Sequence, residues 1–286
     1  NWAILAARDT PALIAPTSPM TPFSPPIPQD SYQTQFWSDA HGSARSLAIA
    51  EAATKAAGPV LVICESNEGM EELRRELRYF IANDPALKLF SLPDWETLPY
   101  DNFSPHQDIV SDRLSALYHL PNLERGILVV SITSLMHKLP PKAYVLANTL
   151  KLKVGQKLVI NELRAQLVAA GYQSVDAVYE HGEFAVRGSI IDLFPMGSRQ
   201  PFRIDLWDDE IETLRLFNPE TQLSEGKIPE VRLLPGREYP LDEAGVTRFR
   251  SAFRDRFDVD LRQAPLYQDV SDGLASPGLE YYLSLF

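Results

Sequence analysis

Residues 182–217 have the sequence GEFAVRGSIIDLFPMGSRQPFRIDLWDDEIETLRLF, which carries the clearest local pattern of the chain. Phe202, Ile204 and Leu206 alternate with Arg203, Asp205 and Trp207, which is the period of a strand with one buried face and one wet face. The polar residues 208–210 interrupt this pattern, and residues 211–217 are predicted to return as the second strand of a hairpin. The alternation at 183–187 predicts a further strand upstream.

The alternation places Trp207 on the outward face together with Arg203, roughly 13 Å away at a rise of about 3.3 Å per residue. An exposed tryptophan near an arginine has the composition of a protein-binding hot spot. A second interpretation is that another part of the same chain covers Trp207. The sequence does not choose between the two.

The length, net charge and cysteine count of the chain exclude several classes of protein and of binding site. The 286 residues suffice for one large domain or two smaller ones. The net charge of −11 argues against a nucleic-acid-binding surface over most of the molecule, because DNA affinity comes largely from Lys and Arg, and it suits a protein that binds proteins. Cys64 is the only cysteine, which excludes an internal disulfide or a Cys-based zinc site. With no run of 18 apolar residues and no export signal, we expect a cytoplasmic protein without a membrane partner.

The middle of the chain alternates predicted strands and helices. Strands are predicted at 60–64, 87–92 and 127–132, and helices at 46–57, 68–82 and 108–120. This order is typical of a parallel α/β sheet. After Pro140-Pro141, a helix capped by Asn161 and ended by Gly171 precedes the hairpin region, which predicts a small inserted α+β domain. Another helix is predicted to begin near Asp242, and the apolar residues 281–286 suggest a piece of a longer protein.

Three segments of the sequence resemble one known family. They are LPDWETLPYDNFSPHQDIVSDRL from Leu92, EHGEFAVRGSIIDLFPMGS from Glu180 and PFRIDLWDDEIETLR from Pro201. In this order they resemble the N-terminal region of bacterial transcription-repair coupling factors, which is in turn similar to the repair protein UvrB. The resemblance runs from about Gly58 to the end of the chain.

The resemblance implies a degenerate UvrB/RecA-like α/β fold with an inserted domain. We predict a Pro-rich extended segment at 1–36, a UvrB-like domain 1a at 37–148, a UvrB-like domain 2 that binds UvrA at 149–234, and the start of domain 1b at 235–286.

UvrB carries a phosphate-binding loop before the first helix of its α/β domain, and this chain departs from that pattern. Matched to G-x-x-x-x-G-K-[ST], Asp39 and Ala44 replace the two glycines and Arg45 replaces the lysine, while Ser46 remains. Gly42 is the glycine that lies inside this stretch. We expect a degenerate nucleotide loop without ATPase activity, with ATP and Mg²⁺ used only by the downstream motor of the full-length relatives.

The aromatic stretch at 94–103 corresponds to the DNA-inserting hairpin of UvrB. Trp95, Tyr100 and Phe103 are the aromatic residues, but acidic residues surround them and no Lys or Arg follows until Arg113. Stacking platforms for single strands normally come with positive charge, so a packed loop is the favoured interpretation. The scattered histidines and the acidic turn 208–210 predict no metal site.

The resemblance assigns UvrA binding to Arg187, Arg203 and Trp207, with Glu183 and Asp205 expected to hold the arginines in place. Trp207 stands where the family also uses Phe. We therefore expect a protein-binding module that recruits UvrA to stalled RNA polymerase, with polymerase and DNA contacts outside this chain. Two alternatives stay open: a nucleotide-binding helicase fragment that uses Arg45 and Ser46, and a damaged-DNA-binding module that uses the aromatic stretch.

Overall fold

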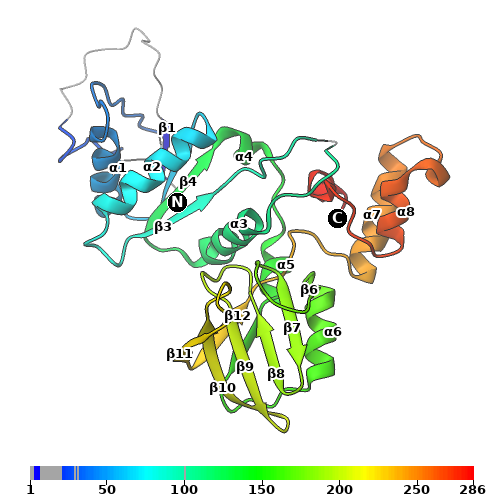
Figure 1. Ribbon diagram of the computed structural model, residues 1–286. Helices are drawn as coiled ribbons and strands as arrows, with labels where there is room; N and C mark the ends of the chain where they lie inside the picture. Colours follow the sequence, from blue (N-terminus) through cyan, green and yellow to red (C-terminus); the bar gives the residue numbers. More distant parts are fainter. Residues whose placement is uncertain (1–2, 7–20, 29, 31, 100) are drawn as a thin grey trace. The chain divides into compact units, whose positions relative to one another are not determined.

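A computed structural model of the chain describes residues 3–6, 21–28, 30, 32–99 and 101–286 (Figure 1). The chain divides into two compact units. Unit 1 comprises Asn1–Asp94 and Asn122–Met136, and unit 2 comprises Trp95–Pro121 and His137–Phe286. The four segment boundaries expected above stay a prediction. Residues 7–20 of the expected proline-rich segment lie outside the described residues, whereas its prolines at 22, 25, 26 and 28 are described and lie outside helices.

Unit 1 contains the predicted parallel sheet. Its strands are β1 (Ala3–Ala6), β2 (Val60–Cys64), β3 (Lys88–Leu92) and β4 (Gly126–Ser131), in the order β1-β2-β4-β3, and every pair is parallel. The helices are α1 (Ala44–Lys55), α2 (Asn67–Phe80) and the short α4 (Ile132–Met136). Strand β1 was not predicted, because its four residues carry no distinguishing pattern.

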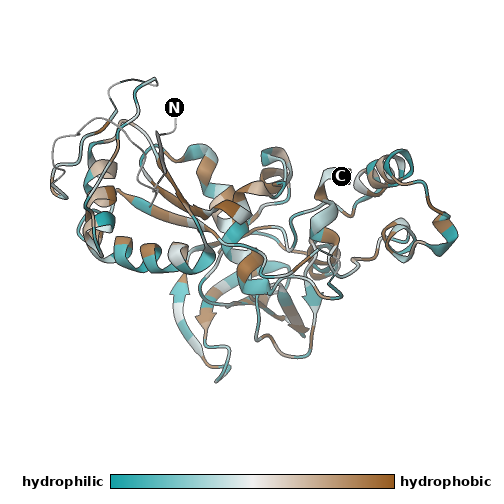
Figure 2. Cartoon of the chain, turned by 90° about the horizontal axis from the view of Figure 1, so that it is seen from above, coloured by the Kyte–Doolittle hydropathy of each residue, from teal (hydrophilic) through white to brown (hydrophobic). Residues whose placement is uncertain are grey.

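The core of unit 1 forms between the sheet and helices α1 and α2. Strand β4 is buried along its whole length, as expected for a central strand of a parallel sheet. In Figure 2 the strands of this sheet are mostly brown, whereas α2 alternates between teal and brown. Its apolar positions Met70, Leu73 and Leu77 are spaced by three and four residues and are all buried.

Unit 2 contains a six-stranded sheet in the order β11-β10-β9-β8-β7-β6. These strands are β6 (Gln173–Ser174), β7 (Glu183–Arg187), β8 (Ile190–Leu193), β9 (Phe202–Trp207), β10 (Glu210–Phe217) and β11 (Ser224–Ile228). Only the β6–β7 pair is parallel. Strands β5 (Leu150–Lys153) and β12 (Glu230–Leu233) form a separate antiparallel pair.

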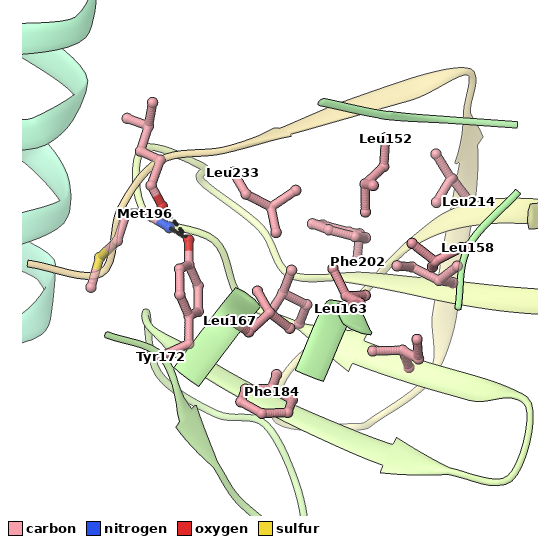
Figure 3. Packing of buried hydrophobic residues seen from close by; sticks show 14 of the residues in the cluster. Leu152, Leu158, Leu163, Leu167, Tyr172, Phe184, Met196, Phe202, Leu214 and Leu233 are labelled. Carbon is pink, nitrogen blue, oxygen red and sulfur yellow. Dashed lines mark hydrogen bonds between the residues drawn. The ribbon is translucent and has the colours of Figure 1, made fainter. Parts of the chain in front are cut away.

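One face of this sheet packs on helix α6 (Ile160–Ala170). Figure 3 shows Leu163 and Leu167 of α6 directed at Phe184 and Phe202, all four of which are buried. The buried hydroxyl of Tyr172 accepts a hydrogen bond from the Met196 amide (3.2 Å) and donates one to the Leu234 carbonyl (2.7 Å), and burial raises its pKa. The predicted wet face is therefore the opposite one, and at one end it buries a small apolar cluster of Val178, Ala185, Phe194 and Phe217.

The remaining helices of unit 2 are α3 (Gln107–His119), α5 (Lys142–Ala147), α7 (Glu243–Arg256) and α8 (Pro265–Ser271). Two 3₁₀ turns, Leu261–Gln263 and Leu279–Leu285, also lie in unit 2, and a third, Leu120–Asn122, lies at the unit boundary. Helices α7 and α8 and the last 3₁₀ turn enclose an aromatic-rich cluster of their own.

Most element predictions match the structure within a few residues, and the hairpin β9–β10 is confirmed. Asp208 lies in the turn with a φ of 56°. The expected N-cap of α6 is wrong: the helix begins at Ile160, one residue before Asn161, and the residue ahead of it is Val159, whose side chain is apolar. The predicted end of this helix is confirmed, since Gly171 follows α6 with a φ of 99°.

Candidate protein-binding surface

The wet face of the sheet is defined by strand register. Residues that pair directly across antiparallel strands point to the same side. Asp192 pairs with Arg203, which pairs with Arg215, and one step along Asp205 pairs with Thr213. We call this surface the outer face; its members are Arg187, Asp192, Arg203, Asp205, Trp207, Thr213 and Arg215.

Asp192 organises one end of the outer face. Its carboxylate is fully buried and accepts hydrogen bonds from Arg203 Nε to Oδ1 (2.6 Å) and from Arg203 Nη2 to Oδ2 (3.0 Å). Arg187 donates from Nη2 to the same Oδ2. Two guanidinium groups therefore share one buried carboxylate, which is the strong, charge-assisted class of hydrogen bond.

Arg203 and Arg187 differ in how much of each side chain reaches solvent. The Arg203 side chain is only 15% exposed, its guanidinium lies 5.1 Å from the ring centre of Phe217, and Nη1 donates to Ser224 Oγ at 3.2 Å. The hydrogen bond to Asp192 raises the pKa of Arg203 further. The Arg187 side chain is 50% exposed, so more of it reaches solvent.

A second carboxylate lies beside the first. Asp205 accepts hydrogen bonds from Arg215 Nη2 (2.6 Å) and from the Thr213 hydroxyl (2.6 Å). The expectation that Glu183 and Asp205 hold Arg187 and Arg203 is wrong. Glu183 accepts from the amides of residues 179 and 180, and the carboxylate that holds both arginines belongs to Asp192.

Asp192, Thr213 and Arg215 are the outer-face residues that sequence reasoning missed. The signal was present for Asp192, a lone carboxylate between the apolar residues Ile191 and Leu193, although no strand was predicted at 190–193. An acidic residue at an alternating position of a central strand needs a cationic neighbour, because a buried charge is costly unless it is paired.

Trp207 stands at the other end of the outer face and is not covered by its own chain. It is 75% exposed, which decides between the two interpretations of this residue. A shallow hollow beside it is lined by Trp207, Glu210 and Glu212. On the adjoining turn Asp209 pairs with Lys157 (3.1 Å), and this hydrogen bond raises the lysine pKa.

The predicted nucleotide loop lies in unit 1, around the start of α1. Asp39 and Gly42 have φ values of 62° and 54°, and α1 begins at Ala44, followed by Arg45. The hydroxyls of Ser46, which is fully buried, and of Ser43 (2.8 Å) both donate to the carboxylate of Glu76. Hydrogen bonding to Ser46 is the main cause that lowers the pKa of Glu76. The Ser46 hydroxyl, which a phosphate loop would offer to Mg²⁺, is thus already hydrogen-bonded to the ionised carboxylate of Glu76.

The aromatic stretch is packed at its first member. Trp95 is 2% exposed, stacks on His137 with ring centres 4.5 Å apart, and donates from Nε1 to Glu238 (3.2 Å). Tyr100 lies outside the described residues, and Phe103 is 57% exposed. A tryptophan held in this way does not stack on a base, so the packed-loop interpretation is confirmed for Trp95.

Two further searches covered the described part of the chain. No group of three or more His, Cys, Asp or Glu residues there is arranged to hold a metal ion. Among the same residues, no helix is both long and apolar enough to cross a membrane.

Comparison with known proteins gives the outer face its context. Residues 150–239 match the family model described as the UvrB interaction domain, which contains the six-stranded sheet and α6. The chain is 42% identical over 260 residues to the transcription-repair-coupling factor of Escherichia coli, which covers 91% of this chain and 22% of that protein. The corresponding protein of Haemophilus influenzae is 43% identical over 266 residues, covering 92% and 23%. The factor of Myxococcus xanthus is 32% identical over 253 residues, covering 86% and 21%.

The chain thus spans only about a fifth of the length of these relatives. Within that fifth the similarity runs through both units, and the matched family model lies on the sheet that bears the outer face. The chain belongs to the transcription-repair-coupling factor family, as a UvrB-like region that carries the UvrB interaction domain.

Proposed function

We propose that this chain recruits the nucleotide excision repair protein UvrA to stalled RNA polymerase, and that UvrA docks on the outer face. In this proposal the chain is a protein-binding module without its own ATPase and without a bound cofactor. ATP-driven motor activity and the contacts to RNA polymerase and DNA belong to the remaining four fifths of the related coupling factors.

The observation that carries the proposal is Trp207, a tryptophan that is 75% exposed on a sheet face within a matched interaction domain. Tryptophan and arginine are enriched among the residues that dominate the binding energy of protein interfaces. Tryptophan buries a large area with few torsions fixed, and the planar arginine fork makes bidentate hydrogen bonds. Arg187 is half exposed, and Asp192 fixes its position before any partner arrives. A preorganised side chain loses less entropy on binding.

Arg203 has a different role in this proposal from the one expected from sequence alone. Its Nε, Nη1 and Nη2 all donate within the module, and only 15% of its side chain is exposed. We assign Trp207 and Arg187 to direct contact with UvrA, and Arg203 to holding the carboxylate that positions Arg187.

The test is binding of the purified chain to UvrA by calorimetry, for wild type and for Arg187→Ala, Arg203→Ala and Trp207→Ala. We expect Trp207→Ala to weaken binding by about 2 kcal/mol or more, as truncation of a hot-spot residue does. Wild-type binding that survives in all three variants would place the contact elsewhere.

Matched controls separate contact from general surface effects. Tyr79 on α2 is 77% exposed, so Tyr79→Ala removes an equally exposed aromatic side chain from unit 1. Arg164→Ala removes an exposed arginine from α6, which packs on the opposite face of the sheet. Both variants should bind UvrA as wild type does.

A further inference from the structure

The two ends of the outer face carry opposite charge. At one end, the guanidinium groups of Arg187 and Arg203 share the single carboxylate of Asp192, which leaves net positive charge there. At the other end, Glu210 and Glu212 line the hollow beside Trp207. The Arg215–Asp205 pair between them is neutral as a unit.

The acidic end continues into the turn of the hairpin. Asp208 and Asp209 connect β9 to β10, and of the two Asp209 is the one paired with Lys157. The Lys157 side chain is 77% exposed, so solvent screens its charge, and that charge offsets only part of the negative field around Trp207. The exposed tryptophan is therefore surrounded by carboxylates.

Strand register gives the separation of the two ends. Arg187 pairs with Ile190 on β8, and Ile190 pairs with Asp205 on β9, so Arg187 and Asp205 lie directly opposite each other two strands apart. Trp207 lies two residues beyond Asp205 on β9. With strands about 4.8 Å apart and a rise of about 3.3 Å per residue, the backbones of Arg187 and Trp207 are roughly 12 Å apart. This exceeds the Debye length of about 8 Å at physiological ionic strength, so each end acts on its own part of a partner.

From this charge separation we infer the chemistry of the surface that UvrA presents and the orientation in which it docks. That surface carries an apolar pocket rimmed by Lys or Arg for Trp207, and an acidic side chain roughly 12 Å away for Arg187. The reversed orientation juxtaposes like charges at both ends, which excludes it. The inference rests on the proposed function and adds the complementary charges to it.

Association kinetics with purified UvrA test the inference. Charges at an interface rim act mainly on the association rate, and salt screens their effect. We expect Glu210→Lys/Glu212→Lys to slow association about tenfold or more at low salt, with the difference shrinking as salt is raised. Arg187→Glu should also slow association, through the other end.

The variant Lys157→Gln should associate with UvrA faster than the wild type does. Removing its positive charge leaves Asp209 unopposed and makes the acidic end more negative. Association with UvrA should become several-fold faster at low salt, because the basic rim of the partner is attracted more strongly. An unchanged or slower rate in this variant would contradict the inference.

The control is Glu124→Lys/Glu220→Lys, which changes the net charge by the same amount. Glu124 is exposed in unit 1, and Glu220 is exposed beyond the end of β10 that lies away from Trp207. If Glu210→Lys/Glu212→Lys slows association no more than this control does, or speeds it, the inference is overturned. Melting curves of all variants exclude unfolding as the cause.

The outcomes also separate this inference from the proposal on which it rests. Wild-type chain that does not bind UvrA overturns both. Binding that Trp207→Ala abolishes, while Glu210→Lys/Glu212→Lys leaves the rate unchanged, supports UvrA docking on the outer face and overturns only the charge assignment.

Discussion

Arg203 donates two parallel hydrogen bonds to the buried carboxylate of Asp192, from Nε at 2.6 Å and from Nη2 at 3.0 Å. The pair lies across neighbouring strands β8 and β9 in direct register. It ties the stability of the sheet to the position of Arg187, the side chain proposed to contact UvrA, because the same carboxylate also holds that arginine.

Arg203→Ala should therefore destabilise the fold, whereas Arg187→Ala should not. Loss of Arg203 leaves Asp192, which is fully buried, with one partner that is half exposed. Removing one member of a buried ion pair costs about 3 kcal/mol or more, whereas an exposed pair contributes about 1 kcal/mol or less. Urea unfolding of unit 2, followed by circular dichroism, measures both changes.

The exposed Arg164 on α6 provides the baseline for this comparison. Arg164→Ala should change the free energy of unfolding by no more than about 0.5 kcal/mol, as surface substitutions do. Equal losses for Arg203→Ala and Arg187→Ala would contradict the unequal burial of the two arginines. Because Arg203→Ala is expected to destabilise the fold, its measured UvrA affinity must be corrected for the fraction of unfolded protein.

Sequence alone was enough to predict the hairpin β9–β10 and its wet face, because a period of two fixes which residues point outward. It did not reveal what Arg203 contacts. Asp192 is 11 residues away in sequence and becomes its neighbour only through the β8–β9 register, which the loop between the strands determines. Contacts of this kind are tertiary, so local alternation cannot assign them.

Gly236 is predicted to tolerate no side chain. A Cβ added there would lie 2.7 Å from the Gly171 carbonyl carbon and 2.8 Å from its oxygen, and both atoms are backbone. Gly236→Ala should cost about 2 kcal/mol, since overpacking against atoms that cannot rotate away forces the backbone to shift. Thermal melting measures the loss.

Gly226 on β11 is the matched control, because a Cβ there meets nothing within 4 Å. Gly226→Ala should leave the melting temperature unchanged or raise it slightly, since alanine loses less conformational entropy on folding. A similar loss at both positions would mean that the close approach of the 171 and 236 backbones is absent in solution.

The buried Arg113–Glu238 pair gives a double-variant prediction. Arg113 Nε lies 2.5 Å from Glu238 Oε1, and both side chains are at most 1% exposed. Arg113→Met alone should cost about 3–5 kcal/mol, because it leaves a buried carboxylate unpaired. Adding Glu238→Gln should restore more than half of that loss, since the neutral amide oxygen still accepts from Trp95.

Urea unfolding of the two single variants and the double variant measures this coupling. Stability losses of the two single variants that simply add in the double variant would contradict a buried pair.

The contacts of Trp95 could not be assigned from sequence, because its partners Glu238 and Tyr281 lie more than 140 residues away. The acidic residues around the tryptophan, the absence of Lys or Arg before Arg113 and the shortness of the segment pointed to a packed loop, but not to these partners.

Glu280 should make the fold less stable as pH rises. Burial is the main cause that raises its pKa above the ordinary value. The native state therefore binds this proton more tightly than the unfolded state, and its contribution to stability is complete below the unfolded pKa of 4.5 and lost as pH rises through the native pKa. Glu280→Gln should stabilise the protein at pH 7.5, with a gain that shrinks toward pH 4.

Glu76 should contribute to stability with the opposite pH dependence from Glu280. Its pKa is lowered, chiefly by the hydrogen bond from Ser46, so its contribution is present above the unfolded pKa and lost on acidification. Glu76→Gln should therefore destabilise unit 1 at pH 7.5 and become neutral at low pH. Denaturant unfolding at several pH values distinguishes the two, and a shared sign would contradict the different environments of the two carboxylates.

The same Glu76 carboxylate leads us to expect that Mg-ATP does not stabilise the chain. A phosphate at the start of α1 would have to displace an ionised carboxylate from the hydroxyls of Ser43 and Ser46, with the carboxylate of Asp39 close in sequence. A ligand that binds the native state at ten times its dissociation constant adds about 1.4 kcal/mol, which raises the melting temperature of a domain of this size by roughly 3–5 °C. We expect no such rise at millimolar Mg-ATP. A rise in wild type that Ser46→Ala removes would show that this loop binds nucleotide, and would favour the alternative of a nucleotide-binding helicase fragment.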